Sequence, residues 1–523
     1  MDYDYVIVGA GSAGAVMAAR LSAKAGVNVA LIEAGPDYRS DQTPRAIRSP
    51  NPHQIITSPD YADYRWDALT SRRTAAQTPR TYWRGRGLGG SSAINGQIAI
   101  RGTVEDFDDW AAAGCAGWSF DDVLPAFNRL ETDLRYGGEA YHGDGGPIPI
   151  YRAPVSLWGA VDQAFAEAAL DEGHPWAPDH NAPGSTGVSP YAINSRDGGR
   201  VSVNDGYIDP ARSRNTLAVF GGSHVDRVLF DGDRAVGVRV CQGGVWRDVR
   251  GGTVILSAGA VHSPAILMRS GVGPADHLRE LGIAVTRDLP VGDGFQDHPA
   301  IFLPIRLAPH ARPPGGFRHT NACLRYSSGL AGAGPNDMMM VAMNRFGDSL
   351  GHHVTAPDGE DVFGLIGLWV NQCLSRGSVR LASADPFDQP VIEENMLSDP
   401  SDRERMRDGV RRLLSLARRG AVRAIGEPVI GLAADADDAT IDGFALANAG
   451  DTQHATSTCR MGAPDDSAAV ADTEGRVFGL EGLRVIDASL MPSVPRANTH
   501  LTTVMMAEHI AARMLGERPS AQG

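Results

Sequence analysis

The chain has 523 residues, of which 42% are hydrophobic and 21% are charged, with 62 glycines and 33 prolines. This length exceeds what one simple core accommodates, so two joined domains are expected. The composition is that of an ordinary globular protein without low-complexity segments. The formal net charge of -14 argues against a nucleic-acid partner, because phosphate-binding surfaces need clustered Lys and Arg.

Three features favour the cytoplasm as the location. The chain opens with a strand-like segment and a glycine turn rather than a basic stretch before an apolar one, so no secretion signal is predicted. The apolar run 362–370 is too short to cross a bilayer, so no membrane partner is expected. The five cysteines are scattered and never form a CxxC pair, which favours reduced thiols and predicts no metal site.

The first motif in chain order lies at the N-terminus. An apolar strand at 5–8 runs into the turn GAGSAG at 9–14, and a helix is predicted over 15–21. Gly9 allows the tight turn, Gly11 lets the backbone approach a pyrophosphate, and Gly14 lets helix and strand pack closely. A second strand at 27–32 ends at Glu33, about 20 residues further on, where a carboxylate can hold ribose hydroxyls. The motif predicts a dinucleotide site and leaves FAD and NAD both open.

Three later segments carry a family resemblance. They are RGRGLGGSSAIN at 84–95, GAVHSP at 259–264, and the stretch 482–500, which contains GLRVIDASLMP and ends in NTH. Strands are predicted at 217–220, 253–257 and 483–486, and the last delivers Asp487 to a strand end. Together with the N-terminal turn, these segments resemble the signatures of the glucose–methanol–choline (GMC) oxidoreductases. The resemblance extends from residue 5 to about residue 512 and implies FAD as the cofactor.

The resemblance also implies which residues hold FAD. Taken alone, Trp66, Arg86 and Val225 fit ordinary core or surface positions equally well. Some family members bond a histidine to the flavin, and the matching position is Ile94, so noncovalent FAD is expected. The implied FAD-binding residues are Gly9, Gly11, Ser12, Ala13, Gly14, Glu33, Ala34, Trp66, Arg86, Leu88, Gly90, Asn95, Val225, Asp487, Ala488, His500 and Leu501.

The same resemblance predicts an α/β fold in which a Rossmann-type FAD-binding domain is interleaved with an α+β substrate domain built on an antiparallel sheet. FAD-binding parts are expected at 1–155, 195–300 and 450–523, the last also catalytic. The substrate domain is expected at 301–449, with 156–194 as an excursion near the cofactor. A long helix is predicted to about Arg418, with Asp399 as its N-cap and Pro400 as its first residue.

Two histidines are the catalytic candidates that the resemblance implies, His454 and His500. Removal of a hydride from an alcohol carbon is difficult until the hydroxyl loses its proton, and imidazole, with a pKa of ~6.5, accepts a proton near neutral pH. We expect His454 to act as the base and His500 to help hold the alkoxide, with reversed or shared roles left open. A helix predicted at 503–515 follows His500, and its N-terminus would favour negative charge on reduced FAD.

The substrate is predicted from a narrower resemblance. The stretches 145–150, 368–371 and 492–499 are similar to those of bacterial primary-alcohol oxidases, such as 5-(hydroxymethyl)furfural and aryl-alcohol oxidases. Trp369 is a candidate for the substrate pocket. Gln453 stands where those oxidases can carry a bulky aromatic, which favours a roomier or more polar pocket. The prediction is oxidation of an aromatic or heteroaromatic primary alcohol to the aldehyde, by hydride transfer to flavin N5 and with O₂ as acceptor.

Several alternatives stay open from the sequence. A dehydrogenase that passes electrons to a quinone or another acceptor would share every motif. Some family members cleave hydroxynitriles and keep FAD without net redox chemistry, so a lyase is the second alternative. An NAD-dependent enzyme is disfavoured by the segments at 84–102 and 482–500. A flavin-binding protein without turnover is disfavoured by the intact histidine pair.

Overall fold

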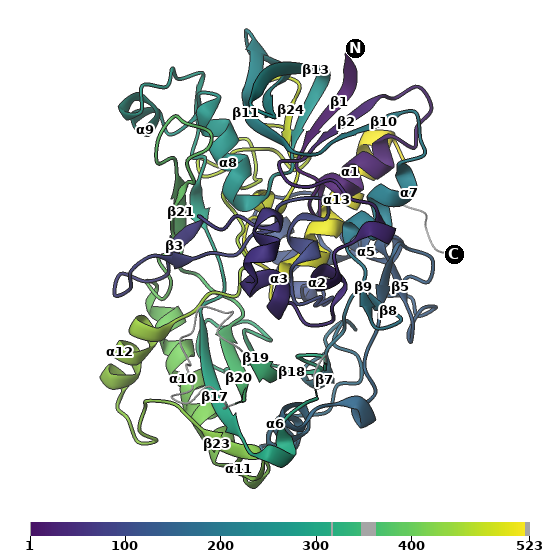
Figure 1. Cartoon of the computed structure of the whole chain (residues 1–523). Helices are drawn as coiled ribbons and strands as arrows, with labels where there is room; N and C mark the ends of the chain where they lie inside the picture. The colour runs from purple at the N-terminus through teal and green to yellow at the C-terminus, as the bar shows by residue number, and fades with distance from the viewer. Residues whose placement is uncertain (1, 315–316, 347–361, 518–523) are drawn as a thin grey trace.

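The N-terminal motif lies at the centre of a seven-stranded sheet (Figure 1). The computed structural model describes residues 2–314, 317–346 and 362–517. Five strands are parallel in the order β10-β2-β1-β13-β24, and β12 and β11 continue from β13 as antiparallel neighbours. The strands are β1 (Tyr3–Val8), β2 (Val29–Ile32), β10 (Leu217–Phe220), β11 (Ser223–Asp231), β12 (Arg234–Gln242), β13 (Val245–Leu256) and β24 (Leu483–Val485).

Burial explains why this sheet is parallel in its middle. All four residues of β2 are buried, as are the last three of β1 and of β13, because helices cover the sheet. The strands predicted at 5–8, 27–32, 217–220, 253–257 and 483–486 are confirmed, with ends shifted by at most two residues except that β13 begins at Val245, eight residues before its predicted start. The principal helices of this half are α1 (Gly14–Leu21), α4 (Val104–Ala112), α5 (Phe120–Leu130), α8 (Gly259–Arg269) and α13 (Thr499–Leu515).

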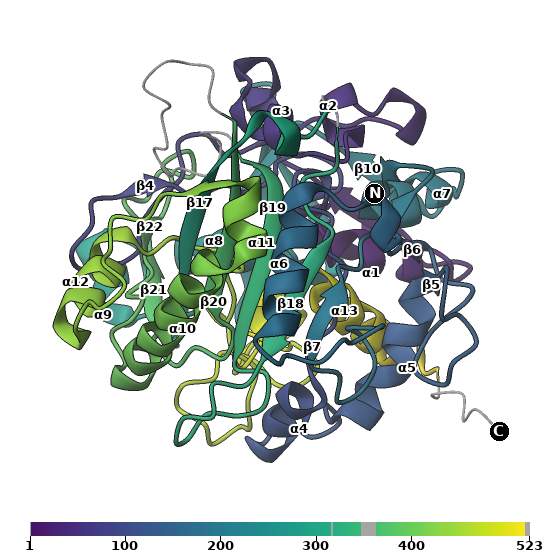
Figure 2. The ribbon, with the colours of Figure 1, turned by 90° about the horizontal axis from the view of Figure 1, so that it is seen from below.

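A second, antiparallel sheet occupies the lower half of the molecule in Figure 1. Its strand order is β23-β17-β20-β19-β18-β7, and α6, α10 and α11 cover its outer face (Figure 2). The elements are β7 (Gly187–Pro190), β17 (Ala300–Leu307), β18 (Ala322–Tyr326), β19 (Met338–Phe346), β20 (Phe363–Val370), β23 (Gly426–Pro428), α6 (Ala160–Asp171), α10 (Pro400–Arg418), α11 (Gly420–Ile425) and α12 (Asp438–Asn448).

Alternation along these strands separates two environments. On β19, Met338, Met340 and Ala342 pack into the core beneath the helices, whereas Met339 and Val341 belong to the core of the nucleotide-binding half. The apolar run 362–370 becomes the central strand β20, which is buried on both faces. The predicted long helix is confirmed as α10, with the Asp399 carboxylate accepting the Ser401 N–H at 2.8 Å.

Smaller elements join the two halves. A third sheet, in the order β16-β21-β22-β3-β4, combines segments from three parts of the chain. The segment 156–194, predicted as an excursion near the cofactor, contributes β7 to the second sheet and α6 to the helices that pack on it. The predicted domain boundaries stay a prediction. No helix among the described residues has the length and apolar character needed to cross a membrane. The remaining strands and α-helices are β3 (Thr70–Arg72), β4 (Arg80–Thr81), β5 (Glu131–Asp133), β6 (Ile148–Ile150), β8 (Ser195–Arg196), β9 (Gly199–Arg200), β14 (Val272–Gly273), β15 (Arg287–Asp288), β16 (Asp293–Phe295), β21 (Gly377–Arg380), β22 (Val391–Glu393), α2 (Arg45–Arg48), α3 (His53–Thr57), α7 (Asp209–Ala211) and α9 (Ala275–Glu280).

Candidate active site

A cavity of about 1380 Å³ is lined by residues of both sheets. The carboxyl ends of β1, β13 and β24 are adjacent, since Val8 pairs with Leu256 and Leu256 with Val485. The loops that follow these strands form one wall, at the usual ligand position of an open α/β sheet. The inner face of the antiparallel sheet contributes to another wall. The volume exceeds that of a pocket for one small ligand and suits a dinucleotide with a substrate beside it.

The three glycines of the N-terminal turn have different surroundings. A Cβ on Gly14 would lie 1.9 Å from the Gly9 carbonyl oxygen, and one on Gly9 would lie 2.5 Å from the Ser257 carbonyl oxygen. A Cβ on Gly11 would meet only the Gly90 Cα, at 3.9 Å. Gly11 also lines the cavity, whereas Gly14 does not. Two of the glycines therefore serve packing, and Gly11 leaves bare backbone where a pyrophosphate can approach.

The Glu33 carboxylate joins the turn to the later glycine-rich segment. It accepts backbone N–H groups from Ala10 at 2.9 Å, Gly35 at 2.9 Å and Gly87 at 2.8 Å. Burial raises the pKa of Glu33 above that of an ordinary glutamate, and the three N–H groups oppose the rise. Because Glu33 also lines the cavity, one of its oxygens can serve both the fold and a ribose hydroxyl.

Aromatic rings gather at the end of the cavity near Trp66. The Trp66 ring lies 4.3 Å from the His262 ring, and the Arg86 guanidinium lies 5.2 Å from the Trp66 ring centroid. Val225 lines the same region together with Trp66 and His262. Arg86 does not line the cavity and instead donates to the Ala34 carbonyl oxygen at 3.3 Å. Arg86 therefore packs against the Trp66 ring in a cation–π contact.

Most of the predicted site residues lie on the cavity wall, and four do not. Leu88 and Leu501 are fully buried core residues, and Gly14 and Arg86 act through packing as described. The predicted residues that line the cavity are Gly9, Gly11, Ser12, Ala13, Glu33, Ala34, Trp66, Gly90, Asn95, Val225, Trp369, Gln453, His454, Asp487, Ala488 and His500.

His454 is held by hydrogen bonds on both ring nitrogens. Its Nδ1 lies 2.8 Å from Thr452 Oγ1 and 2.9 Å from His298 Nδ1, and its Nε2 lies 3.0 Å from Asn498 Nδ2. Its backbone N–H donates to Asp297 at 2.8 Å. Burial, followed by the His298 and Arg84 charges, holds the pKa of His454 well below that of a free imidazole. The neutral base form is therefore favoured at neutral pH.

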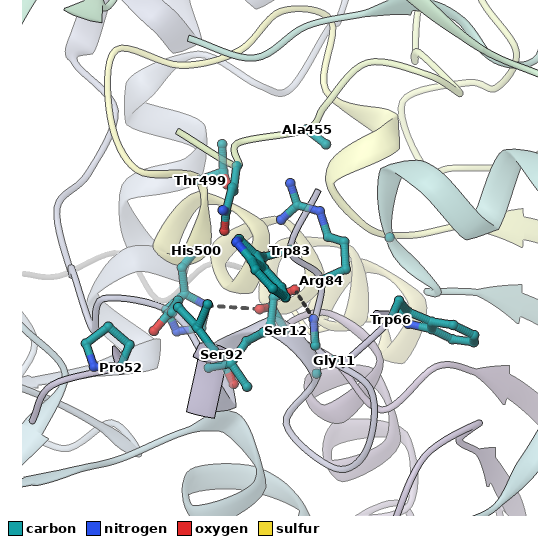
Figure 3. A pocket seen from close by; sticks show the side chains of 18 of the residues that line it. Gly11, Ser12, Pro52, Trp66, Trp83, Arg84, Ser92, Ala455, Thr499 and His500 are labelled. Atoms are coloured by element: carbon teal, nitrogen blue, oxygen red, sulfur yellow. Dashed lines mark hydrogen bonds between the residues drawn. The ribbon is translucent and has the colours of Figure 1, made fainter. Parts of the chain in front are cut away.

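His500 is held through only one nitrogen. Its Nδ1 lies 3.0 Å from Ser12 Oγ (Figure 3). Its Nε2 is buried and has no hydrogen-bond partner in the part of the chain that the structure describes. Burial, followed by the Arg200 charge, lowers the pKa of His500 to about 4. The helix predicted to begin at residue 503 in fact begins at Thr499, so His500 lies in the first turn of α13. Its Cα therefore sits at the positive end of the helix dipole.

Apolar side chains from the second sheet form the wall that includes Trp369. Phe302 of β17, Val341 and Met343 of β19, and Trp369 of β20 all line the cavity. The Trp369 indole N–H is buried, and no described residue accepts a hydrogen bond from it. Gln453 lines the cavity with a left-handed backbone, at φ 63°, a conformation that is uncommon outside glycine.

Sequence reasoning missed the residues that contact His454. Asn498 lies two residues before His500 and was part of the quoted motif, but its contact with His454 was not foreseen. Its Oδ1 accepts the Tyr191 hydroxyl at 2.8 Å, which orients its amide nitrogen toward His454. Thr452, His298 and Tyr191 stand in no motif that the sequence singles out, so no local signal could have found them.

The residues present fit FAD. The Gly11 backbone is bare on the cavity side, Glu33 lines the cavity, and the buried Nε2 of His500 has no hydrogen-bond partner among residues 2–314, 317–346 and 362–517. Ile94 lines the cavity and has no group that could bond to a flavin. The expectation of no metal stays a prediction. A separate buried cluster of His142 with Glu131, Asp133 and Asp179 forms ion pairs with Arg101 and Arg152.

Comparisons with known proteins agree with this geometry. A family model described as GMC oxidoreductase matches residues 3–300, and a second with the same description matches residues 374–507. The chain is 38% identical to 5-(hydroxymethyl)furfural oxidase of Methylovorus sp. (strain MP688), over 98% of each chain. It is 36% identical to oxygen-dependent choline dehydrogenase of Pectobacterium atrosepticum, with 99% of this chain and 96% of that protein covered. The solved pyridoxine 4-oxidase from Mesorbium loti superposes with a TM-score of 0.89 at 30% identity, covering 99% of this chain and 100% of that one.

Proposed function

The chain belongs to the GMC oxidoreductase family of FAD-dependent enzymes, and on this premise we propose that it oxidises an aromatic or heteroaromatic primary alcohol to the aldehyde, with O₂ as electron acceptor. The relative named 5-(hydroxymethyl)furfural oxidase, at 38% identity over 98% of each chain, supports this substrate class. One observation supports the aromatic substrate: the cavity that His454 and His500 line also has an apolar and aromatic wall.

That wall suits a flat, neutral ring. Phe302, Val341 and Trp369 present apolar surface, and burial of an aromatic side chain or ligand against such surface is favourable. The unpartnered indole N–H of Trp369 can donate to an oxygen or nitrogen in or on the ring. A heteroaromatic alcohol would use both features.

The charges around the cavity disfavour a quaternary ammonium substrate such as choline. Asp451 lines the cavity, but its carboxylate is buried in an ion pair with Arg73 at 2.5 Å. Asp487 accepts hydrogen bonds from the Gly259 N–H and the Ser263 hydroxyl. Arg84 adds positive charge to the wall. Asp451 and Asp487 are therefore engaged within the protein, and we take the furfural-oxidising relative rather than the choline-oxidising ones as the guide to the substrate.

The mechanism follows from the two histidines. Bound FAD supplies the hydride acceptor. His454 accepts the hydroxyl proton of the substrate at Nε2, where Asn498 now donates a hydrogen bond. The free Nε2 of His500 and the amide of Asn498 hold the substrate oxygen as its charge develops. The N-terminus of α13 adds a positive potential that favours transfer of negative charge toward the cofactor.

Two further parts of the proposal concern the cofactor and the location. FAD is bound noncovalently, because Ile94 offers no nucleophile where some family members bond the flavin. The five cysteines are buried and unpaired, which suits a reducing compartment, and we propose the cytoplasm.

The test is anaerobic mixing of the yellow holoprotein with benzyl-type, furfuryl-type and aliphatic primary alcohols and with choline, followed at the flavin absorbance, and then admission of air. Bleaching by aromatic alcohols with rapid recovery in air is expected. Bleaching without recovery in air would overturn the oxidase assignment in favour of a dehydrogenase with another acceptor. No bleaching by any alcohol, in protein that contains FAD, would overturn the alcohol oxidation itself and favour a lyase.

A further inference from the structure

A buried polar chain lies behind His454, on the side away from the Asn498 contact. The Thr452 hydroxyl lies 2.8 Å from His454 Nδ1 and donates to Asp297 Oδ1 at 2.9 Å. His298 Nδ1 lies 2.9 Å from the same His454 nitrogen. Asp297 and His298 are adjacent in the sequence and lie about 156 residues before His454, and all three side chains are buried. A polar network in such a place is costly unless every member is satisfied.

The hydrogen bonds of the chain fix which atoms carry protons. His298 Nε2 faces the Pro495 carbonyl oxygen at 3.1 Å, and only an N–H can bond to a carbonyl oxygen. Burial lowers the pKa of His298 to about 4, so the ring is neutral and its Nδ1 has a lone pair. That lone pair requires His454 Nδ1 to be the donor. The Thr452 hydroxyl gives its own proton to Asp297, so the single Nδ1–H of His454 is shared between Thr452 Oγ1 and His298 Nδ1 in a three-centre hydrogen bond.

The opposite side of His454 leads to the same tautomer independently. The Tyr191 hydroxyl lies 2.8 Å from Asn498 Oδ1, which leaves the NH₂ group of Asn498 facing His454 Nε2 at 3.0 Å. An NH₂ group can only donate, so Nε2 must be the acceptor and must lack a proton. Both sides of the ring therefore require Nδ1–H and an unprotonated Nε2, whose lone pair accepts the Asn498 N–H.

Asp297 is the anionic end of the chain. Its carboxylate accepts the backbone N–H of His298 at 2.7 Å and of His454 at 2.8 Å, and the Tyr82 hydroxyl at 2.7 Å. Burial, followed by the Asp451 charge, raises the pKa of Asp297 to about 6, so the carboxylate is largely ionised above neutral pH. The Thr452 hydroxyl alone separates this carboxylate from the His454 ring.

We propose that Thr452 and Asp297, together with His298, are positioning residues that hold His454 as the Nδ1–H tautomer and stabilise the imidazolium that forms when Nε2 takes the substrate proton. The inference rests on the proposed function. In the reaction the alcohol O–H bond breaks and its proton forms the His454 Nε2–H bond; bound FAD would supply the hydride acceptor as the substrate C–O bond becomes C=O. Thr452 and Asp297 exchange no proton; they orient the ring and offset its new positive charge.

Thr452 offers the sharpest test, because its hydroxyl can be removed with little change of shape. In Thr452→Val holoprotein the limiting rate constant of anaerobic flavin reduction is expected to fall about tenfold or more, but by less than the ~10²–10⁴-fold that the base itself contributes. Thr452→Ser restores the hydroxyl and is expected to recover the rate to within about twofold. FAD content and thermal midpoint are measured on both variants, so that loss of folding is recognised.

The pH profile separates a positioning role from a merely structural one. Neutral His454 is the active form, so the rate falls on the acid side as the ring becomes protonated. Without the Thr452 hydroxyl the imidazolium is less stable, and the acid limb of Thr452→Val is expected at lower pH than in the wild type, with a lower plateau. The charged or titratable groups facing His454 are Asp297, His298 and Arg84, with Tyr82 and Asp451 behind Asp297. An unchanged plateau and limb in Thr452→Val would overturn the proposal.

A second readout does not depend on turnover. ¹⁵N NMR of histidine-labelled holoprotein, with the His454 signal identified by its loss in His454→Asn, is expected to show Nδ1 protonated and Nε2 unprotonated at neutral pH. A protonated Nε2 would overturn the inference even if the alcohol is oxidised. If no alcohol reduces the flavin, the proposed function fails, and the tautomer is still decided by this spectrum.

Discussion

The two candidate histidines differ in how much of each ring is already engaged. His454 has partners on both nitrogens, whereas His500 has Ser12 on Nδ1 and a buried, unpartnered Nε2. A base must be oriented and kept neutral, and the environment of His454 does both. A group that only holds an oxygen needs a free nitrogen, and His500 has one. The geometry therefore favours the division of roles that the sequence left open.

At the residue scale, His454→Ala is expected to lower the rate constant of flavin reduction by ~10²–10⁴-fold, because the alcohol loses its base. FAD content should be retained, since the ring contacts protein groups and not the glycine turn. Stopped-flow reduction by an aromatic alcohol measures this effect. His174→Ala is the control, because His174 packs on Tyr326 outside the cavity. Reduction at the wild-type rate in His454→Ala would remove His454 from the mechanism.

A second residue-scale prediction concerns acid stability and His509. Burial lowers its pKa to about 4, while its Nε2–H donates to the Gly117 carbonyl oxygen at 3.0 Å. The unfolded chain, with a histidine pKa of ~6.5, binds a proton between these values that the folded protein does not. This contribution of His509 to the free energy of unfolding is fully present above pH ~6.5 and is lost as the pH falls toward 4. The loss amounts to about 2 kcal/mol at pH 5.

His509→Gln keeps a donor but cannot titrate, so the variant should lose less of its thermal midpoint than the wild type between pH 7 and pH 5. The same replacement at the exposed His310 should leave the wild-type pH dependence unchanged. Equal losses in all three proteins would show that the charging of His509 does not contribute to acid instability.

At the scale of elements, the turn between β1 and α1 carries two separable tasks. Gly14→Ala would place a Cβ 1.9 Å from the Gly9 carbonyl oxygen, so the free energy of unfolding of the apoprotein should fall by about 1–3 kcal/mol. Gly11→Ala meets no protein atom closer than 3.9 Å and should leave apoprotein stability unchanged while weakening FAD binding. Thermal midpoints of the apoproteins and FAD titrations distinguish the two, and identical behaviour of the variants would contradict this division.

The strand β20 makes a similar separation between its two faces. Leu368 packs beneath α10, and Trp369 lines the cavity. Leu368→Ala should cost about 2–5 kcal/mol of stability with little change in KM. Trp369→Leu should raise KM for aromatic alcohols more than for small aliphatic ones. Steady-state kinetics and thermal unfolding of the pair measure both effects; a shift in substrate preference from Leu368→Ala alone would be inconsistent with the cavity wall described.

The local elements were largely predictable, and their partners were not. The strands at 217–220 and 483–486, the helix α10 and its Asp399 cap all follow from short patterns of apolar residues, proline and acid. The start of α13 was placed four residues late, at 503 instead of 499, because Asn498, Thr499 and His500 carry no strong helix signal of their own. Tertiary packing of the helix on α1 and α5 extends it.

At the scale of the whole molecule, the cavity is built from segments far apart in the chain. The loops after β1, β13 and β24 and the face of the antiparallel sheet meet around it. A ligand that contacts all of them stabilises the assembled state by mass action, by about 2.7 kcal/mol at a hundredfold excess over Kd.

FAD added to the apoprotein is therefore expected to raise the thermal midpoint progressively with concentration. Riboflavin at the same concentrations should give a smaller rise, because it lacks the pyrophosphate and adenosine that the Gly11 turn and Glu33 would bind. Differential scanning fluorimetry or calorimetry measures both. Equal shifts with FAD and riboflavin would contradict the assignment of the N-terminal turn as the dinucleotide site.

The sequence by itself determined the cofactor and the family, and it predicted the two catalytic histidines, because these depend on motifs whose residues are close together in the chain. It also predicted Trp369 and Gln453 as wall residues, which the structure places on the cavity. Only the tertiary structure decided what surrounds His454. Thr452 is a near neighbour, but His298 and Asn498 are 156 and 44 residues away, and their hydrogen bonds depend on how strands and loops converge. An apolar pattern that repeats every 2 or 3.6 residues fixes which face of a strand or helix a side chain occupies. It carries no information about which residue of another segment that side chain will contact.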